Sequence, residues 1–348
     1  MLIISLIALV LICCYGVKYN GINDSFDVYL SRIQTDSIKG IFILVVFLSH
    51  ANGYIARSGY AYNTLGDNLF TLFFSLIGQL MVVMFLFYSG YGVMESIKKK
   101  GSEYVCKIPR RRVLNTLLNF DVAVFLFLIA DLLIGKNVTV TQFLLSLIAW
   151  LSIGNSTWYI FVIILCYIST WIIASLFPTL IEKHKLGGIM MVLLSVIAIV
   201  LAFFKPSWWY DTILAYPAGV VYSEYKEQIE HIVKKRYFLW MFTTTVLLIL
   251  LYMIPYGLHG FKTNFVGIVF ALWIVLLTMK INIGNRFLSW CGAQLFPMYI
   301  YQRIPMMIMD AIGPMYFLNR MPIFFLAVSL IITFLISLSY ECWRISIK

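Results

Sequence analysis

The stretch Ile38-Lys-Gly-Ile-Phe-Ile-Leu-Val-Val-Phe-Leu-Ser-His50 places a histidine at the end of an apolar run that begins beside a lysine. A helix rises about 1.5 Å per residue, so His50 lies roughly 16 Å from Lys39 along the axis. If Lys39 marks a membrane surface, His50 is near the middle of a hydrocarbon layer about 30 Å thick. An ionisable side chain at that depth is costly and normally faces a cavity or pathway. His50 is therefore the first candidate for chemistry.

Composition places the chain among the integral membrane proteins. Hydrophobic residues make up 62% of the 348 residues and charged residues only 12%, which is far from a soluble domain. The apolar runs reach about twenty residues without polar alternation, which predicts membrane helices and excludes the strands of a barrel. The expected fold is an all-α polytopic helical bundle. The six cysteines show no metal-ligand spacing, so no metal site is predicted.

The apolar runs and the charged loops between them predict about eleven spans. The run at 140–153 is short for a crossing. When it is treated as an interfacial or re-entrant helix, most of the 26 Lys and Arg residues fall on one side. The positive-inside rule then places the N-terminus outside and the C-terminus inside. We expect a single membrane domain, with an extra span and linker at 1–30 and a ten-helix core at 31–343.

The net charge of +11 is concentrated in short loops. Lys98–Lys100 and the stretch Arg110, Arg111 and Arg112 bracket one predicted cytoplasmic loop. They fit positive-inside anchors that contact anionic headgroups of the bilayer. They equally fit a docking surface for the phosphates of a cytosolic ligand. No nucleic-acid-binding motif accompanies the charge, so no nucleic-acid partner is expected.

Other polar and aromatic groups fall within or beside predicted spans. Arg303 and Asp310 lie seven residues apart on one predicted helix, where they can form an ion pair or bind a substrate. A set of aromatic residues lies at predicted outer ends of spans, where it fits a membrane-interface belt or a platform for sugar rings. That set is Trp158, Trp208, Trp209 and Tyr210.

The sequence resembles the acyltransferase family 3 membrane proteins. Asp36-Ser-Ile-Lys39-Gly40 followed by His50 is similar to the family signature of Asp, two residues, Arg-Gly, and a histidine eleven residues after the Arg. Later segments resemble further family landmarks and occur in the same order along roughly residues 31–343. These segments are Met84–Gly92, Lys107–Arg112, Thr157–Phe161, Ala215–Gly219 and Gly292–Tyr301.

Three positions depart from the family pattern. Lys39 replaces the usual arginine and so lacks the planar fork that grips phosphate with two hydrogen bonds. Gln302 stands where the family often has a second histidine. The usual Arg-x-x-Arg after the third span becomes Arg110-Arg111-Arg112 followed by Asn115.

The resemblance implies that the protein moves an acyl group, usually acetyl, from cytosolic acyl-CoA to a hydroxyl of a cell-surface or lipid-linked polysaccharide. The implied setting is the bacterial plasma membrane. Acetyl-CoA is then a co-substrate, a glycan is the acceptor, and no bound cofactor is expected. His50 is implied as the general base or a transient acyl carrier, and Lys39 as a group at the cytoplasmic mouth. The expected substrate-binding residues are Asp36, Ser89, Tyr91, Arg110, Arg111, Arg112, Trp158, Gln302 and Arg303.

Two other functions fit a membrane protein with these residues. A glycan polymerase or flippase is one, although polymerases commonly carry a large extracytoplasmic loop, and no loop of that size occurs here. A transporter that couples transport to protons through His50, Arg303 and Asp310 is the other. Such transporters often contain inverted repeats with broken helices, and the sequence shows no such symmetry.

Overall fold

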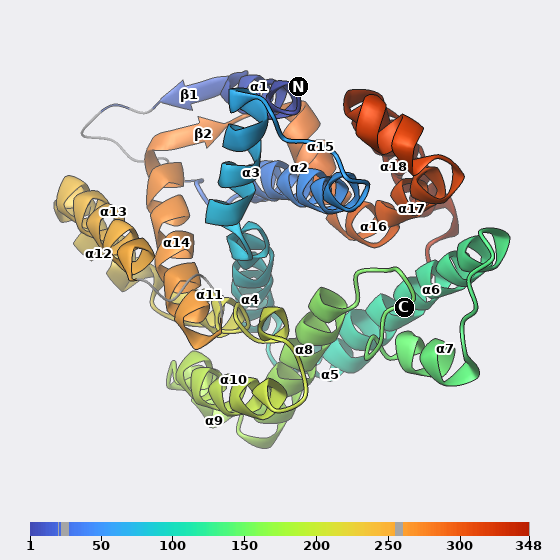
Figure 1. The fold of residues 1–348 in the computed structure, drawn as a ribbon. Coiled ribbons are helices and arrows are strands. Elements are labelled where there is room, and N and C mark those ends of the chain that lie inside the picture. The colour runs from blue at the N-terminus through green and yellow to red at the C-terminus, as the bar shows by residue number, and fades with distance from the viewer. Residues whose placement is uncertain (20, 22–27, 255–259, 348) are drawn as a thin grey trace.

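The fold is a bundle of helices with one very small sheet (Figure 1). The computed structural model describes residues 1–19, 21, 28–254 and 260–347. It is 79% helical, so the all-α class is confirmed. Residues 20 and 22–27 of the predicted linker at 1–30 lie outside the described residues.

The helices and strands follow one another without a separate soluble domain among the described residues. In chain order they are α1 (Ile3–Cys14), β1 (Val17–Tyr19), α2 (Arg32–Arg57), α3 (Leu65–Ile77), α4 (Leu80–Lys100), α5 (Ser102–Ile108), the π-helix η1 (Pro109–Leu114), α6 (Asn115–Leu133), α7 (Val140–Leu147), α8 (Trp158–Leu176), α9 (Thr179–Glu182), α10 (Leu186–Ala202), the 3₁₀-helix η2 (Ser207–Trp209), α11 (Ala215–Glu224), α12 (Lys226–Lys235), α13 (Tyr237–Met253), α14 (Phe261–Lys280), β2 (Ile281–Ile283), α15 (Arg286–Ala293), α16 (Leu295–Tyr301), α17 (Arg303–Ile312), the π-helix η3 (Pro314–Arg320) and α18 (Pro322–Trp343).

The described residues contain six helical segments long and apolar enough to cross a membrane. A seventh arises if α12 and α13, which meet at a bend of 102°, count as one span. The six are Arg32–Arg57, Leu65–Lys100, Ser102–Leu133, Trp158–Leu176, Phe261–Lys280 and Pro322–Trp343. The protein is thus an integral membrane protein, but eleven spans and the orientation of the termini are not confirmed.

Several apolar runs form short helices instead of continuous spans. The run at 287–312 is divided into α15, α16 and α17, with breaks at Gln294 and Gln302. Pro297 and Pro305 each lie in the first turn of the following helix. Backbone N–H groups in the first turn have no partner within the helix, so a proline there costs no helical hydrogen bond. The run at 140–153 contains only the eight-residue α7, which is consistent with a segment that does not cross.

Helix α2, which carries His50, is packed against α15 at a very short distance. Its N-cap Ser31 accepts a hydrogen bond from the Gln34 amide, which satisfies one of the free donors of the first turn. A Cβ atom on Gly40 would overlap the backbone carbonyl of Leu288, and a Cβ on Gly292 would overlap the carbonyl of Asp36. Only glycine at both positions allows the two backbones to touch.

Helices α4 and α11 form a second crossing of the same kind. A Cβ on Gly90 would overlap the Tyr216 carbonyl, and a Cβ on Gly219 would overlap the Phe87 carbonyl. Because α4 also packs on α2, the two crossings form one frame in the middle of the molecule (Figure 1). That frame sets the position of His50.

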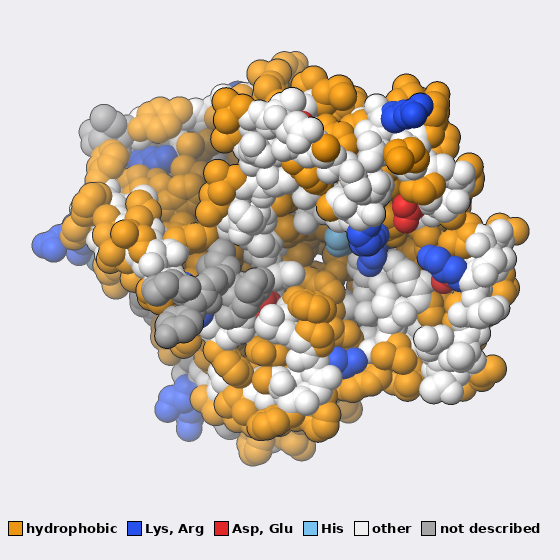
Figure 2. Space-filling view, viewed as in Figure 1, with side chains coloured by type: hydrophobic (Ala, Val, Ile, Leu, Met, Phe, Trp, Pro, Cys, Tyr) orange, Lys and Arg blue, Asp and Glu red, His pale blue; other side chains and the backbone are white. Residues whose placement is uncertain are grey.

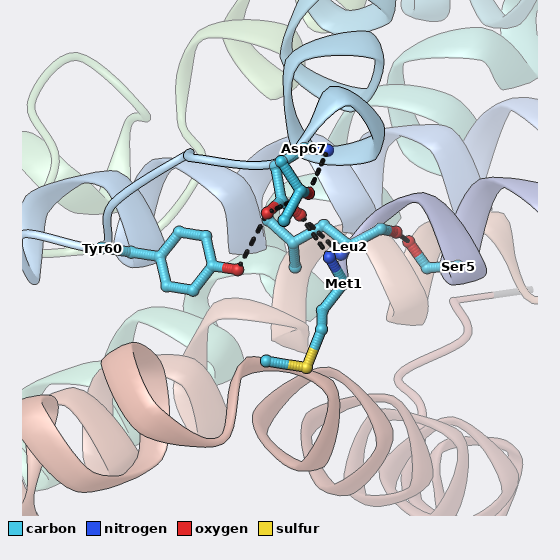
Figure 3. A network of polar contacts seen from close by, with 6 residues as sticks. Met1, Leu2, Ser5, Tyr60 and Asp67 are labelled. Carbon is cyan, nitrogen blue, oxygen red and sulfur yellow. Dashed lines mark hydrogen bonds and ion pairs between the residues drawn. The ribbon is translucent and has the colours of Figure 1, made fainter.

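The N-terminal helix is attached to α3 by the Asp67 carboxylate (Figure 3). One carboxylate oxygen accepts hydrogen bonds from the Met1 amino group at 2.6 Å and the Leu2 amide at 2.9 Å. The other accepts from the Thr64 hydroxyl at 2.7 Å and the Tyr60 hydroxyl at 3.2 Å. The carboxylate is only 1% exposed, so these four donors compensate for its burial.

The small sheet joins the segment after α1 to the segment before α15. β1 and β2 are antiparallel, with Val17 opposite Ile283. The Gln34 side chain of α2 bonds the Ile281 carbonyl at 2.9 Å and the Ile283 amide at 3.0 Å. The sheet is therefore fixed to the start of α2.

Candidate active site between two cavities

His50 lies near the C-terminal end of α2, on the wall of a cavity of about 680 Å³. The cavity is formed by the loop 150–157, the segment 203–209, the start of α8 and Arg303. Figure 2 shows a hollow in the middle of one face, with a histidine side chain inside it and basic side chains beside it. Its wall carries the indoles of Trp150, Trp158, Trp208 and Trp209. We call it the aromatic cavity.

The Lys205 ammonium lies between two of these indoles. Its Nζ is 3.6 Å from the ring centroid of Trp150 and 4.1 Å from that of Trp209. It also donates a hydrogen bond to the Trp150 carbonyl at 2.6 Å. The two rings contact one another edge to face, with centroids 6.1 Å apart. Attraction between the cation and both ring faces holds the ammonium in place.

Arg303, the first residue of α17, is the second basic group of the aromatic cavity. Its Nη1 donates to the Asn155 carbonyl at 3.4 Å, and its guanidinium lies 5.8 Å from the Tyr54 ring. The Nε atom is buried without a hydrogen-bond partner. No ion pair joins Arg303 to Asp310 or to another carboxylate in the part of the chain that the structure describes.

A second cavity, of about 500 Å³, is lined by three arginines, and we call it the arginine cavity. Arg111 and Arg112 come from η1, and Arg344 follows α18. Arg112 donates from Nε to the Tyr104 hydroxyl at 3.1 Å and lies 5.8 Å from the Tyr167 ring. Ser89 also lines this cavity, as does Glu341, whose carboxylate is 3.9 Å from Arg344.

Two tyrosines separate the cavities. Tyr159 and Tyr299 both line the arginine cavity, and their ring centroids are 5.1 Å apart. Tyr299 also contacts the His50 ring, with centroids 6.3 Å apart. Tyr299 is 2% exposed, and Nδ1 of His50 is buried without a hydrogen-bond partner. One aromatic ring thus lies between the histidine and the arginine cavity.

Helix α8 passes both cavities. Its first residue, Trp158, belongs to the aromatic cavity, whereas Tyr159, Ile163 and Tyr167 line the arginine cavity. Trp158 and Tyr167 are nine positions apart, or about 14 Å along a helix. The cavities therefore follow one another along this helix, with the tyrosines and His50 where they approach.

The predicted site residues divide into three groups. His50, Trp158 and Arg303 line the aromatic cavity, and Ser89, Arg111 and Arg112 line the arginine cavity. The remaining five, which line neither, are Asp36, Lys39, Tyr91, Arg110 and Gln302. Among these, Arg110 is exposed and Gln302 is fully buried, with its Nε2 donating to the Tyr299 carbonyl at 3.2 Å.

Lys39 is engaged in an ion pair within its own helix. Its Nζ is 2.6 Å from Asp36, whose other oxygen is 3.5 Å from Arg32. Asp36 is buried against α15. Since Lys39 is eleven residues before His50, about 16 Å separate them along α2. Lys39 and His50 are therefore not neighbours on α2, and the predicted role of Lys39 at the cytoplasmic mouth stays a prediction.

Tyr299, Lys205 and Arg344 are among the residues of the two cavities that were not predicted. Tyr299 belongs to a segment that resembles the family, but no signal marked it as a neighbour of His50. Lys205 precedes Pro206 and the Trp208–Trp209 pair, and a basic residue beside clustered aromatics was the available signal. Arg344 follows the last span as an ordinary membrane-edge arginine, and nothing local distinguishes it.

The fold and the site together define an integral membrane helical protein with a buried histidine between two cavities. The family model described as an acyltransferase domain matches residues 32–342, and the chain belongs to this family, acyltransferase family 3. The protein is accordingly an acyltransferase. Searches of curated proteins and of solved structures gave no significant match.

Proposed function

We propose that the protein transfers an acyl group, typically acetyl, from acyl-CoA in the arginine cavity to a hydroxyl of a glycan in the aromatic cavity. The observation that carries this proposal is the contact of His50, on the wall of the aromatic cavity, with Tyr299, on the wall of the arginine cavity. A transferase needs a donor and an acceptor on either side of one reactive group. This arrangement provides such a meeting point.

The arginine cavity suits the donor. Coenzyme A carries several phosphate charges, and the guanidinium fork matches phosphate oxygens. Arg112 is oriented by Tyr104 and Tyr167, whereas Arg111 is exposed at the cavity. With the nucleotide held there, the thioester arm extends along α8 toward Ser89 and Tyr159. The positive-inside prediction places this cavity at the cytoplasmic side, where acyl-CoA is found.

The reaction follows from the position of His50. As a general base, its imidazole takes the proton from the acceptor hydroxyl while the oxygen attacks the thioester carbonyl. The tetrahedral intermediate collapses, the C–S bond breaks, and the CoA thiolate takes the proton from the imidazolium. Tyr299, by turning its ring, opens the path and donates a hydrogen bond to the oxyanion. A transient acyl-histidine gives the same products, because the acceptor hydroxyl then attacks the acyl-imidazole.

The aromatic cavity suits the acceptor. The apolar faces of sugar rings pack on indoles, and four indoles line this cavity. The expected acceptor is a polysaccharide, or its lipid-linked precursor, at the envelope of a bacterial cell.

The test is acetylation by membranes that contain the wild type or the variant His50→Ala. Membranes are incubated with radiolabelled acetyl-CoA and the glycan fraction is counted. We expect His50→Ala to abolish labelling, whereas His231→Ala, an exposed histidine of α12, retains it. Wild-type labelling by His50→Ala at equal protein level would refute the proposal.

A further inference from the structure

The charge of the aromatic cavity is of one sign. Lys205 and Arg303 both line it, and its lining contains no Asp or Glu among the described residues. Neutral sugars do not require two cations, because hydroxyl groups are bound by neutral donors and acceptors. Two cations without a carboxylate in one cavity create a strong positive potential, which attracts an anion.

Lys205 is held so that its charge stays inside the cavity. An ammonium has three N–H donors, and among the described residues one of them is used, by the Trp150 carbonyl. Contact with two indoles displaces part of the water around the group, and this partial desolvation lowers the pKa of Lys205. A desolvated cation gains more from an anionic partner than one in water does.

Arg303 also lacks a counter-charge. Among the described residues, its one hydrogen bond is the 3.4 Å contact with the Asn155 carbonyl, and its buried Nε has no partner there. Removing water from a charged group that has no partner costs free energy. An anion bound in the cavity would remove that cost.

The nearest carboxyl group along the chain does not supply the missing charge. Asp211 follows the Trp208–Trp209 pair but does not line the cavity, and its side chain is fully buried. It lies between η2 and α11, outside the candidate spans, and burial raises the pKa of Asp211 to about 8. At pH 7 this carboxyl is therefore mainly protonated and leaves the cavity positive.

We infer that the acceptor is an anionic glycan, whose carboxylate or phosphate group lies between Lys205 and Arg303 while a nearby hydroxyl faces His50. This inference rests on the proposed function and adds the chemical class of the acceptor. Lys205 contacts the anion and makes the protein select an anionic glycan over a neutral one. The four indoles pack on the sugar ring, and His50 acts on the hydroxyl.

The test compares three matched acceptors with purified full-length protein and acetyl-CoA. They are a neutral glucose oligosaccharide, the same oligosaccharide with glucuronate, and the same with a sugar phosphate. Release of CoA at each acceptor concentration gives kcat/KM. The variants are Lys205→Gln, the charge-conserving Lys205→Arg, and Lys262→Gln. Lys262 lies at the same end of the molecule, beside the Phe261–Tyr210 ring contact, but outside the cavity lining.

We expect the wild type to prefer at least one anionic acceptor over the neutral one by roughly tenfold or more, as for a hydrogen bond to a charged group. Lys205→Gln should lose most of this preference, mainly through a higher KM, whereas Lys205→Arg and Lys262→Gln retain it. A carboxylate preference or a phosphate preference identifies which anion is bound. Equal use of all three acceptors, or an unchanged preference in Lys205→Gln, would overturn the inference.

A binding measurement separates this inference from the proposed function. Equilibrium binding of the labelled glucuronate and sugar-phosphate oligosaccharides is measured without acetyl-CoA, against the neutral one. Transfer that depends on His50 but shows no anion preference retains the proposed function and overturns only the inference. Anion binding that depends on Lys205, in a protein that acetylates no glycan, retains the cavity assignment and overturns the proposed function. If neither the glucuronate nor the sugar-phosphate oligosaccharide binds more tightly than the neutral one, the inference is overturned.

Discussion

The two cavities are both basic, but their positive charges have different surroundings. The arginine cavity has three guanidinium groups, two of which, Arg111 and Arg344, are exposed, and includes Glu341 beside Arg344. The aromatic cavity has one caged ammonium and one guanidinium, no carboxylate among its described lining residues, and four indoles. Guanidinium groups near solvent suit the multiple phosphates of a soluble cofactor. Cations set among indoles suit a sugar that carries one charge. Under the proposed function, this difference assigns the arginine cavity to the donor and the aromatic cavity to the acceptor without reference to membrane orientation.

Removal of the ring between the cavities should have the largest effect. Tyr299→Ala would join them and leave His50 without its aromatic neighbour, so water can reach the thioester. We expect transfer to fall at least about 100-fold, as for loss of an oxyanion donor, with more acetyl-CoA hydrolysed per acetyl group transferred. Tyr299→Phe keeps the ring and should lose transfer without the gain in hydrolysis. Parallel assays of CoA release and glycan labelling measure both hydrolysis and transfer. Undiminished transfer by Tyr299→Ala would contradict the proposed role of the Tyr299 ring.

Removal of Arg112, the arginine that two tyrosines hold at the arginine cavity, should weaken only the binding of the donor. Arg112→Ala removes the guanidinium that Tyr104 and Tyr167 hold at the arginine cavity. We expect the KM for acetyl-CoA to rise about tenfold, the value for one hydrogen bond to a charged group, with the KM for the glycan unchanged. Arg112→Lys should show an intermediate KM because the charge remains and the fork is lost. If only the KM for the glycan changed, the arginine cavity would have to be assigned to the acceptor and the aromatic cavity to the donor.

Removal of one indole should produce the smallest loss of activity and should change only the kinetic constants for the acceptor glycan. Trp158→Ala takes away one of four indoles of the aromatic cavity. One aromatic contact contributes about 0.5–1.5 kcal/mol, so kcat/KM for the glycan should fall roughly threefold to tenfold, with the KM for acetyl-CoA unchanged. Trp240→Ala on α13, an exposed indole outside both cavities, is the matched control. A loss of equal size in both variants would assign the effect to membrane anchoring.

The fold class could be predicted, and His50 could be singled out as a candidate, because each depends on local information. A histidine within an apolar run, and a composition that is 62% hydrophobic, remain informative without any tertiary contact. The pair of Asp36 and Lys39 was equally local, at a spacing of three residues on a helix. The sequence could therefore have predicted the ion pair between Lys39 and Asp36.

The division into two cavities could not be predicted in the same way. It depends on contacts between α2, α8 and α16, which are more than a hundred residues apart. The count of eleven spans is not confirmed, and hydropathy alone cannot settle it, because hydropathy measures how apolar a run is and does not record where its helix breaks. At 287–312 the polar residues Gln294 and Gln302 and the prolines that follow them divide one apolar run into three helices.

The glycine crossings have a mechanical consequence for catalysis. Backbones that touch at Gly40 with Leu288, and at Gly90 with Tyr216, cannot slide past one another without steric overlap. The helices that carry His50 and Ser89 therefore belong to a rigid body, and hinge motion must arise elsewhere. Among the described residues, no backbone crossing of this kind involves α16 or the loops at 150–157 and 203–209. Under the proposed function, both substrates would reach His50 by small local movements of these segments, without the rocking of whole halves by which alternating-access carriers expose a site to each side.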